Sequence, residues 1–185
     1  AKAKQAGVVH AIAHEFRFAP SRAYAKDLID QGWLGQLRSV DATLYVAGRV
    51  GSLASPTYTW AAQRAMGGGV LMALGSHFID ALRHWFGDFE GVFGATQVHR
   101  PERTDPVTGE VRLADADDAF SCMLRFKSGA YATLTCSTAA PFGSGGLIKA
   151  FGSDGTIVIP QRAFNPEPGD VVQAGKVGDA ELQTL

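Results

Sequence analysis

The order in which hydrophobic spacing changes along the chain most limits the folds open to it. Helical spacing at residues 20–32 and 67–87 flanks one alternating segment, residues 40–46, in which apolar side chains recur at every second position. The remaining periodic segments are all strand-like. This order predicts an α+β domain, with an open, mostly antiparallel sheet and helices packed on one face.

The strand-like segments after residue 87 are separated by short turns that contain glycine. Lys127–Gly129 and Gly152–Gly155 are such turns, and each is typical of a hairpin. Residues 103–118 are polar and acidic and contain the turn signal Asp105-Pro106-Val107-Thr108-Gly109. An earlier strand is predicted at residues 8–13, after a helix end at residues 3–5. The predicted late strands are residues 89–98, 119–126, 130–138, 147–151 and 156–159.

Charge and composition exclude several classes of protein. The 185 residues include 17 basic and 18 acidic side chains, so no net charge favours nucleic acid or an anionic membrane. The longest run without a polar side chain, residues 66–75, is far shorter than the roughly 20 residues of a membrane span. Two cysteines are too few for a disulfide framework. We expect a cytoplasmic protein that binds neither nucleic acid nor membrane.

The helix at residues 67–87 carries the densest group of chemically active side chains. It opens with three glycines and contains Gly75, which costs about 1 kcal/mol relative to alanine, so a close approach to its backbone is expected. His77, Asp80 and His84 share one stripe of the helix. Of these, His77 can exchange a proton near neutral pH.

Two other interpretations of these side chains stay open. His77 can equally be a half-buried helix histidine that is satisfied by Asp80 or by a backbone carbonyl. A metal site built from His77, Asp80 and His84 has no recognised zinc spacing. We therefore assign no metal ligands in this chain.

Three further residues are candidates for substrate binding. His14 and Arg17 lie at the end of a predicted strand, where side chains often face a cleft, although such an arginine commonly pairs with a surface acid. Trp60 lies in a loop, residues 49–65, that is rich in glycine, serine and proline, and it could stack on a sugar-like face or cover the sheet. No glycine-rich nucleotide motif occurs, so no cofactor-binding residue is assigned.

Several of these motifs occur together in one order and resemble the glucose–fructose oxidoreductase/inositol dehydrogenase (Gfo/Idh/MocA) family. The resemblance covers residues 1 to about 160. The motifs are His14-Glu15-Phe16-Arg17-Phe18-x-Pro20, Leu28-Ile29-x-x-Gly32-x-Leu34-Gly35, Trp60, and Gly67-Gly68-Gly69-x-Leu71-x-x-x-Gly75-x-His77-x-x-Asp80.

The resemblance implies a domain organisation. Family members join an N-terminal Rossmann domain that binds NAD or NADP to a C-terminal α+β domain whose sheet often forms the oligomer interface. By this resemblance residues 1–15 are the last helix and strand of a dinucleotide-binding domain that is otherwise absent from the chain. Residues 16–185 are then the substrate-binding and oligomerisation domain, and a homodimer or higher oligomer is expected.

The resemblance also implies a function, with one departure from the family pattern. His77 aligns with the family's active-site histidine, and Arg17, Trp60, Asp80 and His14 are assigned to substrate binding. Ala73 stands where the family usually has an aspartate. The first hypothesis is therefore an NAD(P)-dependent oxidoreductase acting on a sugar, sugar acid or cyclitol-like alcohol. The alternative is a decayed family member that serves as a binding or assembly module.

Overall fold

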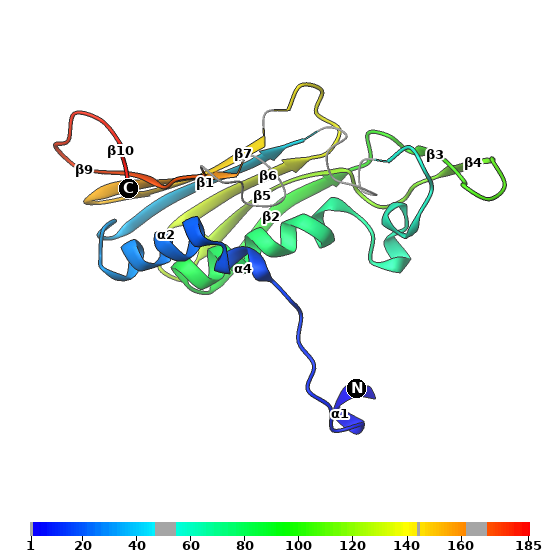
Figure 1. The fold of residues 1–185 in the computed structure, drawn as a ribbon, viewed down its shortest axis with the longest axis horizontal. Coiled ribbons are helices and arrows are strands. Elements are labelled where there is room, and N and C mark those ends of the chain that lie inside the picture. The colour runs from blue at the N-terminus through cyan, green and yellow to red at the C-terminus, as the bar shows by residue number, and fades with distance from the viewer. Residues whose placement is uncertain (1, 47–54, 144, 162–169) are drawn as a thin grey trace.

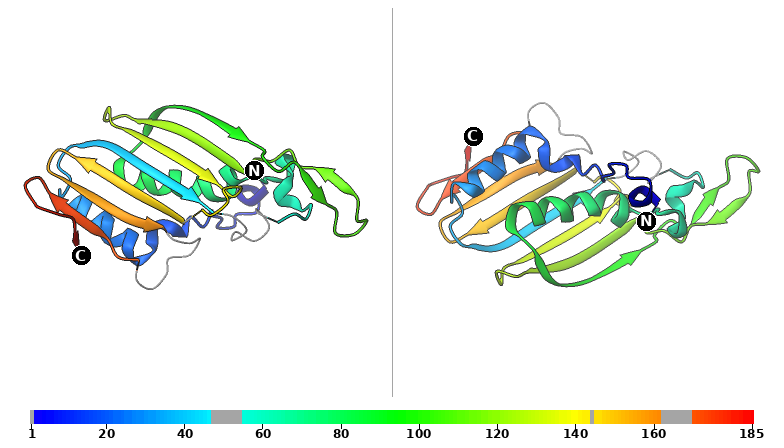
Figure 2. Two further views of the ribbon diagram at one scale, coloured as in Figure 1. Left: turned by 90° about the horizontal axis from the view of Figure 1, so that it is seen from above. Right: turned by 90° about the horizontal axis from the view of Figure 1, so that it is seen from below.

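A computed structural model describes residues 2–46, 55–143, 145–161 and 170–185. Its centre is an eight-stranded sheet with the strand order β10-β9-β8-β7-β1-β6-β5-β2. Helices α2 (Pro20–Asp30) and α4 (Ser76–Phe86) lie on one face of this sheet, and the opposite face carries no described helix (Figures 1 and 2). The predicted α+β architecture, with helices on one face, is confirmed.

The strands follow the alternation of the sequence closely. All described neighbours in the large sheet pair antiparallel, apart from β1 and β6, which are parallel. The sheet is therefore open and mostly antiparallel, as predicted. Its strands are β1 (Leu37–Tyr45), β2 (Phe89–Gln97), β5 (Ala119–Phe126), β6 (Tyr131–Ser137), β7 (Gly145–Gly152), β8 (Gly155–Gln161), β9 (Gln173–Lys176) and β10 (Gln183–Thr184).

The core lies between the sheet and the two helices. On β1 every second side chain from Val40 to Val46 is buried, which places one face of that strand against the helices. On the helix side the 3,4 spacing of the sequence supplies the matching surface, because Phe78 and Leu82 are fully buried. The same helical stretch, Arg64–Phe86, is long and apolar enough to cross a membrane by length and composition. In this fold 44% of its apolar window is buried.

The glycines that open the second helix are explained by close packing within the chain. Gly69 has a φ of +104°, and a Cβ there would collide with the Asp117 carboxylate. The Asp117 Oδ2 atom accepts a hydrogen bond of 2.8 Å from the Leu71 N–H, so this side chain caps the start of the helix. The first turn, η4 (Leu71–Gly75), is π-helical. A Cβ on Gly75 would lie 2.8 Å from the Phe120 ring.

One strand predicted from the sequence is wrong in the structure. Residues 8–13 form no strand, and Val9 and Ile12 are exposed, because no described strand lies beside this segment to pair with it. The preceding helix, α1 (Lys2–Gln5), is present. The turn predicted at residues 105–109 is confirmed, because it connects β3 (Glu102–Thr104) and β4 (Val111–Leu113) in a short hairpin. These three-residue strands are too short to show a period in the sequence.

Candidate functional site

His77 lies in the first turn of α4 and faces a short 3₁₀ turn, η1 (Glu15–Phe18). The imidazole packs on the Phe16 ring with centroids 4.2 Å apart, and the His14 ring meets it edge-on at 5.0 Å. The Glu15 carboxylate oxygen Oε2 lies 3.8 Å from the Nδ1 atom of His77. One histidine of the helix is thus contacted by three consecutive residues, which are His14 at the N-cap of the turn and Glu15 and Phe16 within it.

Asp80, one turn further along α4, contacts the same segment through the side chains of His14 and Arg17. Its Oδ1 atom accepts a hydrogen bond of 3.4 Å from Nη1 of Arg17 and lies 3.6 Å from Nδ1 of His14. The second ring nitrogen of His14, Nε2, lies 3.3 Å from Oγ of Ser76. Asp80 and Ser76 therefore hold His14 and Arg17 against the helix. Both contacts of Asp80 are made by its Oδ1 atom.

A buried arginine of α2 holds the turn in place through contacts with Phe16. Arg22 of α2 is almost fully buried and donates a hydrogen bond of 3.0 Å to the carbonyl of Phe16. Its guanidinium also stacks over the Phe16 ring at 4.6 Å. Burial lowers the pKa of Arg22 to about 10, opposed by the negative charges of Asp170 and Glu15. The turn that carries the polar side chains is thereby attached to the hydrophobic core.

Three buried polar atoms in this cluster have no hydrogen-bond partner among the described residues. They are Nε of Arg17, Nδ1 of His77 and Oδ2 of Asp80. Burial also lowers the pKa of His77, with Glu15 and Asp80 acting in the opposite direction. Buried polar groups are normally hydrogen-bonded, so this cluster has unused donors and acceptors for a polar ligand.

The structure brings together four of the five residues predicted from the sequence. His14, Arg17, His77 and Asp80 form the cluster described above. Trp60 lies elsewhere, in η2 (Trp60–Ala62), with its backbone carbonyl packed against Gly68 and its side chain half exposed. Residues 49–54 of its predicted loop lie outside the described residues.

Two members of the cluster, Glu15 and Ser76, were not among the site residues predicted from the sequence. Glu15 directly follows His14 and Ser76 directly precedes His77, and these neighbours were the sequence signal for them. Among the described residues the Asp80 carboxylate contacts His14 and Arg17, and it makes no hydrogen bond to His77. The interpretation of His77 as a helix histidine satisfied by Asp80 is therefore not supported.

The proposed metal site is not assembled in the structure. Among the described residues no group of three or more His, Cys, Asp or Glu side chains is placed to hold a metal ion. His84, the third ligand of that hypothesis, is exposed on the last turns of α4.

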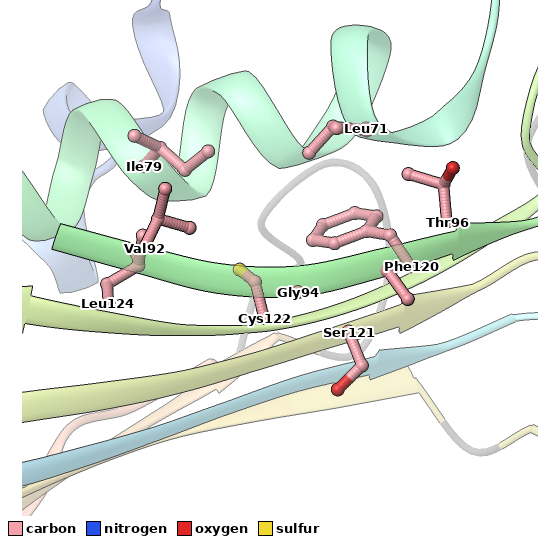
Figure 3. Close-up of a pocket in the computed structure, with 10 residues that line it drawn as sticks. Leu71, Ile79, Val92, Gly94, Thr96, Phe120, Ser121, Cys122 and Leu124 are labelled. Carbon is pink, nitrogen blue, oxygen red and sulfur yellow. The ribbon is translucent and has the colours of Figure 1, made fainter.

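A separate apolar cavity of about 460 Å³ lies on the other side of the helical stretch, between η4, α4 and the edge strand β2 (Figure 3). Cys122 contributes a thiol whose pKa is raised by burial, so the thiol is less readily ionised. The cavity therefore lacks the acid–base groups of the His77 cluster. It is lined by Leu71, Ile79, Val92, Gly94, Ala95, Thr96, Phe120, Ser121, Cys122 and Leu124.

The chain is similar in sequence to known oxidoreductases. An uncharacterized oxidoreductase of Synechocystis sp. is 33% identical over 148 residues, which are 78% of this chain and 39% of that protein. Levoglucosan dehydrogenase of Pseudarthrobacter phenanthrenivorans is 29% identical over 191 aligned residues, covering 95% of this chain and 47% of the enzyme. The chain thus spans less than half the length of these curated relatives.

Solved structures show the same fold. Levoglucosan dehydrogenase in its apo form superposes with a TM-score of 0.81 at 25% identity, covering 96% of this chain and 48% of that one. Its complex with NADH and levoglucosan superposes with a TM-score of 0.77 at 26% identity, covering 96% and 47%. The family profile described as the GFO/IDH/MocA C-terminal domain matches residues 23–158. The chain therefore belongs to the Gfo/Idh/MocA family of oxidoreductases and contains its C-terminal domain.

Proposed function

We propose that this chain is the substrate-binding and oligomerisation domain of an NAD(P)-dependent oxidoreductase that acts on a sugar, a sugar acid or a cyclitol-like alcohol. The observation that carries the proposal is the cluster around His77, in which buried polar atoms of Arg17 and Asp80 have no hydrogen-bond partner among the described residues. A polyhydroxylated substrate offers the hydroxyl groups that would pair with them. The comparisons add that a relative with this fold binds NADH and levoglucosan.

In this proposal the residues of this chain bind the substrate and exchange the proton of its reacting hydroxyl. The nicotinamide, when bound, supplies the hydride acceptor or donor. The described residues contain no glycine-rich phosphate loop, so we assign the dinucleotide mainly to an N-terminal domain of a longer parent protein. His77 exchanges the proton of the reacting hydroxyl, and Arg17 and Asp80 orient the neighbouring hydroxyls. His14 supports that arrangement through Asp80 and Ser76.

The experiment is a steady-state assay of the parent protein with NAD or NADP and a panel of sugars, sugar acids and cyclitols. We expect H77Q to lower kcat by on the order of 100-fold or more, because it removes the acid–base group. The matched control is H84Q, which changes the exposed histidine of the same helix and should retain wild-type turnover. Equal activity of H77Q and the wild type would contradict the assigned role.

One residue motivates the alternative, a decayed member acting as a binding or assembly module. Ala73 offers no side chain that could hold a substrate hydroxyl. If the wild-type parent binds neither NADH nor NADPH and A73D creates turnover, the alternative replaces the main proposal. If the wild type is active and A73D gives no gain or a loss, the site works without a carboxylate at this position.

A further inference from the structure

The surroundings of the Nδ1 atom of His77 indicate which ring nitrogen carries the proton. This atom is buried and has no hydrogen-bond partner in the part of the chain that the structure describes. The Oε2 atom of Glu15 lies 3.8 Å from it, and this distance is too long for a hydrogen bond. The Glu15 side chain is 63% exposed and belongs to the short η1 turn, so a small rotation can bring the carboxylate into hydrogen-bonding distance.

The other charged groups that face His77 make contacts elsewhere. Asp80 contacts His14 and Arg17 through Oδ1, while its Oδ2 has no hydrogen-bond partner among the described residues. The guanidinium of Arg22 donates to the Phe16 carbonyl. His14 meets the His77 ring edge-on, with Nδ1 near Asp80 and Nε2 near Ser76. Glu15 is therefore the acidic residue whose carboxylate lies beside the Nδ1 atom of His77.

We propose that Glu15 is the positioning residue of His77: its carboxylate accepts a hydrogen bond from Nδ1–H and so fixes the tautomer in which Nε2 is the base. This inference rests on the proposed function, in which His77 accepts the alcohol proton. His77 would accept the hydroxyl proton at Nε2 as the C=O bond forms, and the hydride that leaves the carbon would pass to a bound nicotinamide. The Glu15 charge then stabilises the imidazolium.

The first test is a ¹⁵N NMR measurement of the histidine ring nitrogens in this chain, which needs no activity. In the wild type, neutral His77 should carry its proton on Nδ1, and E15A should lose that preference because the acceptor is gone. E15Q keeps a carbonyl acceptor and should restore the Nδ1–H form. H77Q identifies the signals. An unchanged tautomer in E15A would overturn the inference.

The matched control is E90A. Glu90 is a partly exposed glutamate of β2 that pairs with Arg125, so the replacement removes the same charge at a site remote from η1. It should leave the His77 tautomer unchanged. Equal thermal midpoints of E15A, E90A and the wild type would show that each variant folds.

The second test is the pH dependence of kcat/KM in the parent protein. Glu15 raises the pKa of His77, so both E15A and E15Q should move the acid limb of the profile to lower pH. E15A should also lose on the order of 10-fold in kcat, since the ring is no longer oriented. An unshifted limb would contradict the role of Glu15. A wild-type parent without turnover would instead refute the proposed function, and the NMR test would still decide on Glu15.

Discussion

At the scale of single residues, the two histidines of α4 show how packing decides chemistry. His77 and His84 lie two turns apart on the same stripe of the sequence. Only His77 meets the η1 turn, where Phe16 covers its ring and Glu15 and His14 approach its edge. Burial lowers its pKa, which keeps the ring neutral and able to accept a proton near pH 7.

The lowered pKa of His77 predicts a pH dependence of stability. The unfolded chain binds the proton more tightly, with a pKa of about 6.5, so the free energy of unfolding should fall as pH drops below that value. Urea unfolding of the wild type and H77Q at pH 7.5 and 5.5 checks this. H77Q should lose less stability on acidification than the wild type, whereas H84Q should behave like the wild type. Parallel losses in all three proteins would contradict the prediction.

At the scale of elements, the start of the second helix connects the core to the site. The π-helical turn η4 directly precedes the turn that carries Ser76 and His77. Gly75 ends η4 against the Phe120 ring of β5, so the distance between helix and sheet depends on the absence of a side chain there. The cost of glycine in a helix is therefore explained by packing against the sheet.

Gly75 yields a stability prediction. G75A would place a Cβ 2.8 Å from the Phe120 ring, and such overpacking should lower the free energy of unfolding by about 1–3 kcal/mol. The matched control is G91A on β2, where no atom lies within 4 Å of an added Cβ. Denaturant unfolding of both variants measures the difference. A G75A variant as stable as G91A would show that the helix can move away from the sheet without cost.

At the scale of the whole molecule, the sheet has one covered and one uncovered face. The helices cover the first, and Figure 2 shows the strands of the second open to view. On this open face Phe93, Met123 and Tyr131 are exposed, and Phe93 lies directly opposite Met123 in the β2–β5 pairing. Exposed apolar side chains that gather in this way mark association surfaces. They support the proposed homodimer or higher oligomer.

The open face gives a prediction for assembly. Sedimentation of the wild type at micromolar concentration should show a dimer or larger species, and F93D should shift it to monomer because a buried, unpaired charge opposes association. V111D is the control, because Val111 is an exposed valine on the β3–β4 hairpin and lies outside the large sheet. A monomeric wild type, or an F93D protein that assembles like V111D, would contradict the proposal.

The local pattern of the sequence predicted most of the fold. Alternating apolar residues from Val40 to Val46 predicted a strand with one buried face, and the spacing of Phe78 and Leu82 predicted the core side of α4. Residues 8–13 have a similar apolar character but form no strand. A strand requires a neighbour with which to exchange backbone hydrogen bonds, and apolar spacing does not supply that neighbour.

The sequence by itself determined which side chains with acid–base chemistry exist and which helix presents His77, because helical spacing is a local property. Only the tertiary structure decided their partners. Asp80 is three residues from His77, yet it binds His14 and Arg17, whereas Glu15, distant in the chain, lies beside His77. Those pairings depend on how η1 docks on α4, and that docking is set by the burial of Phe16 and Arg22.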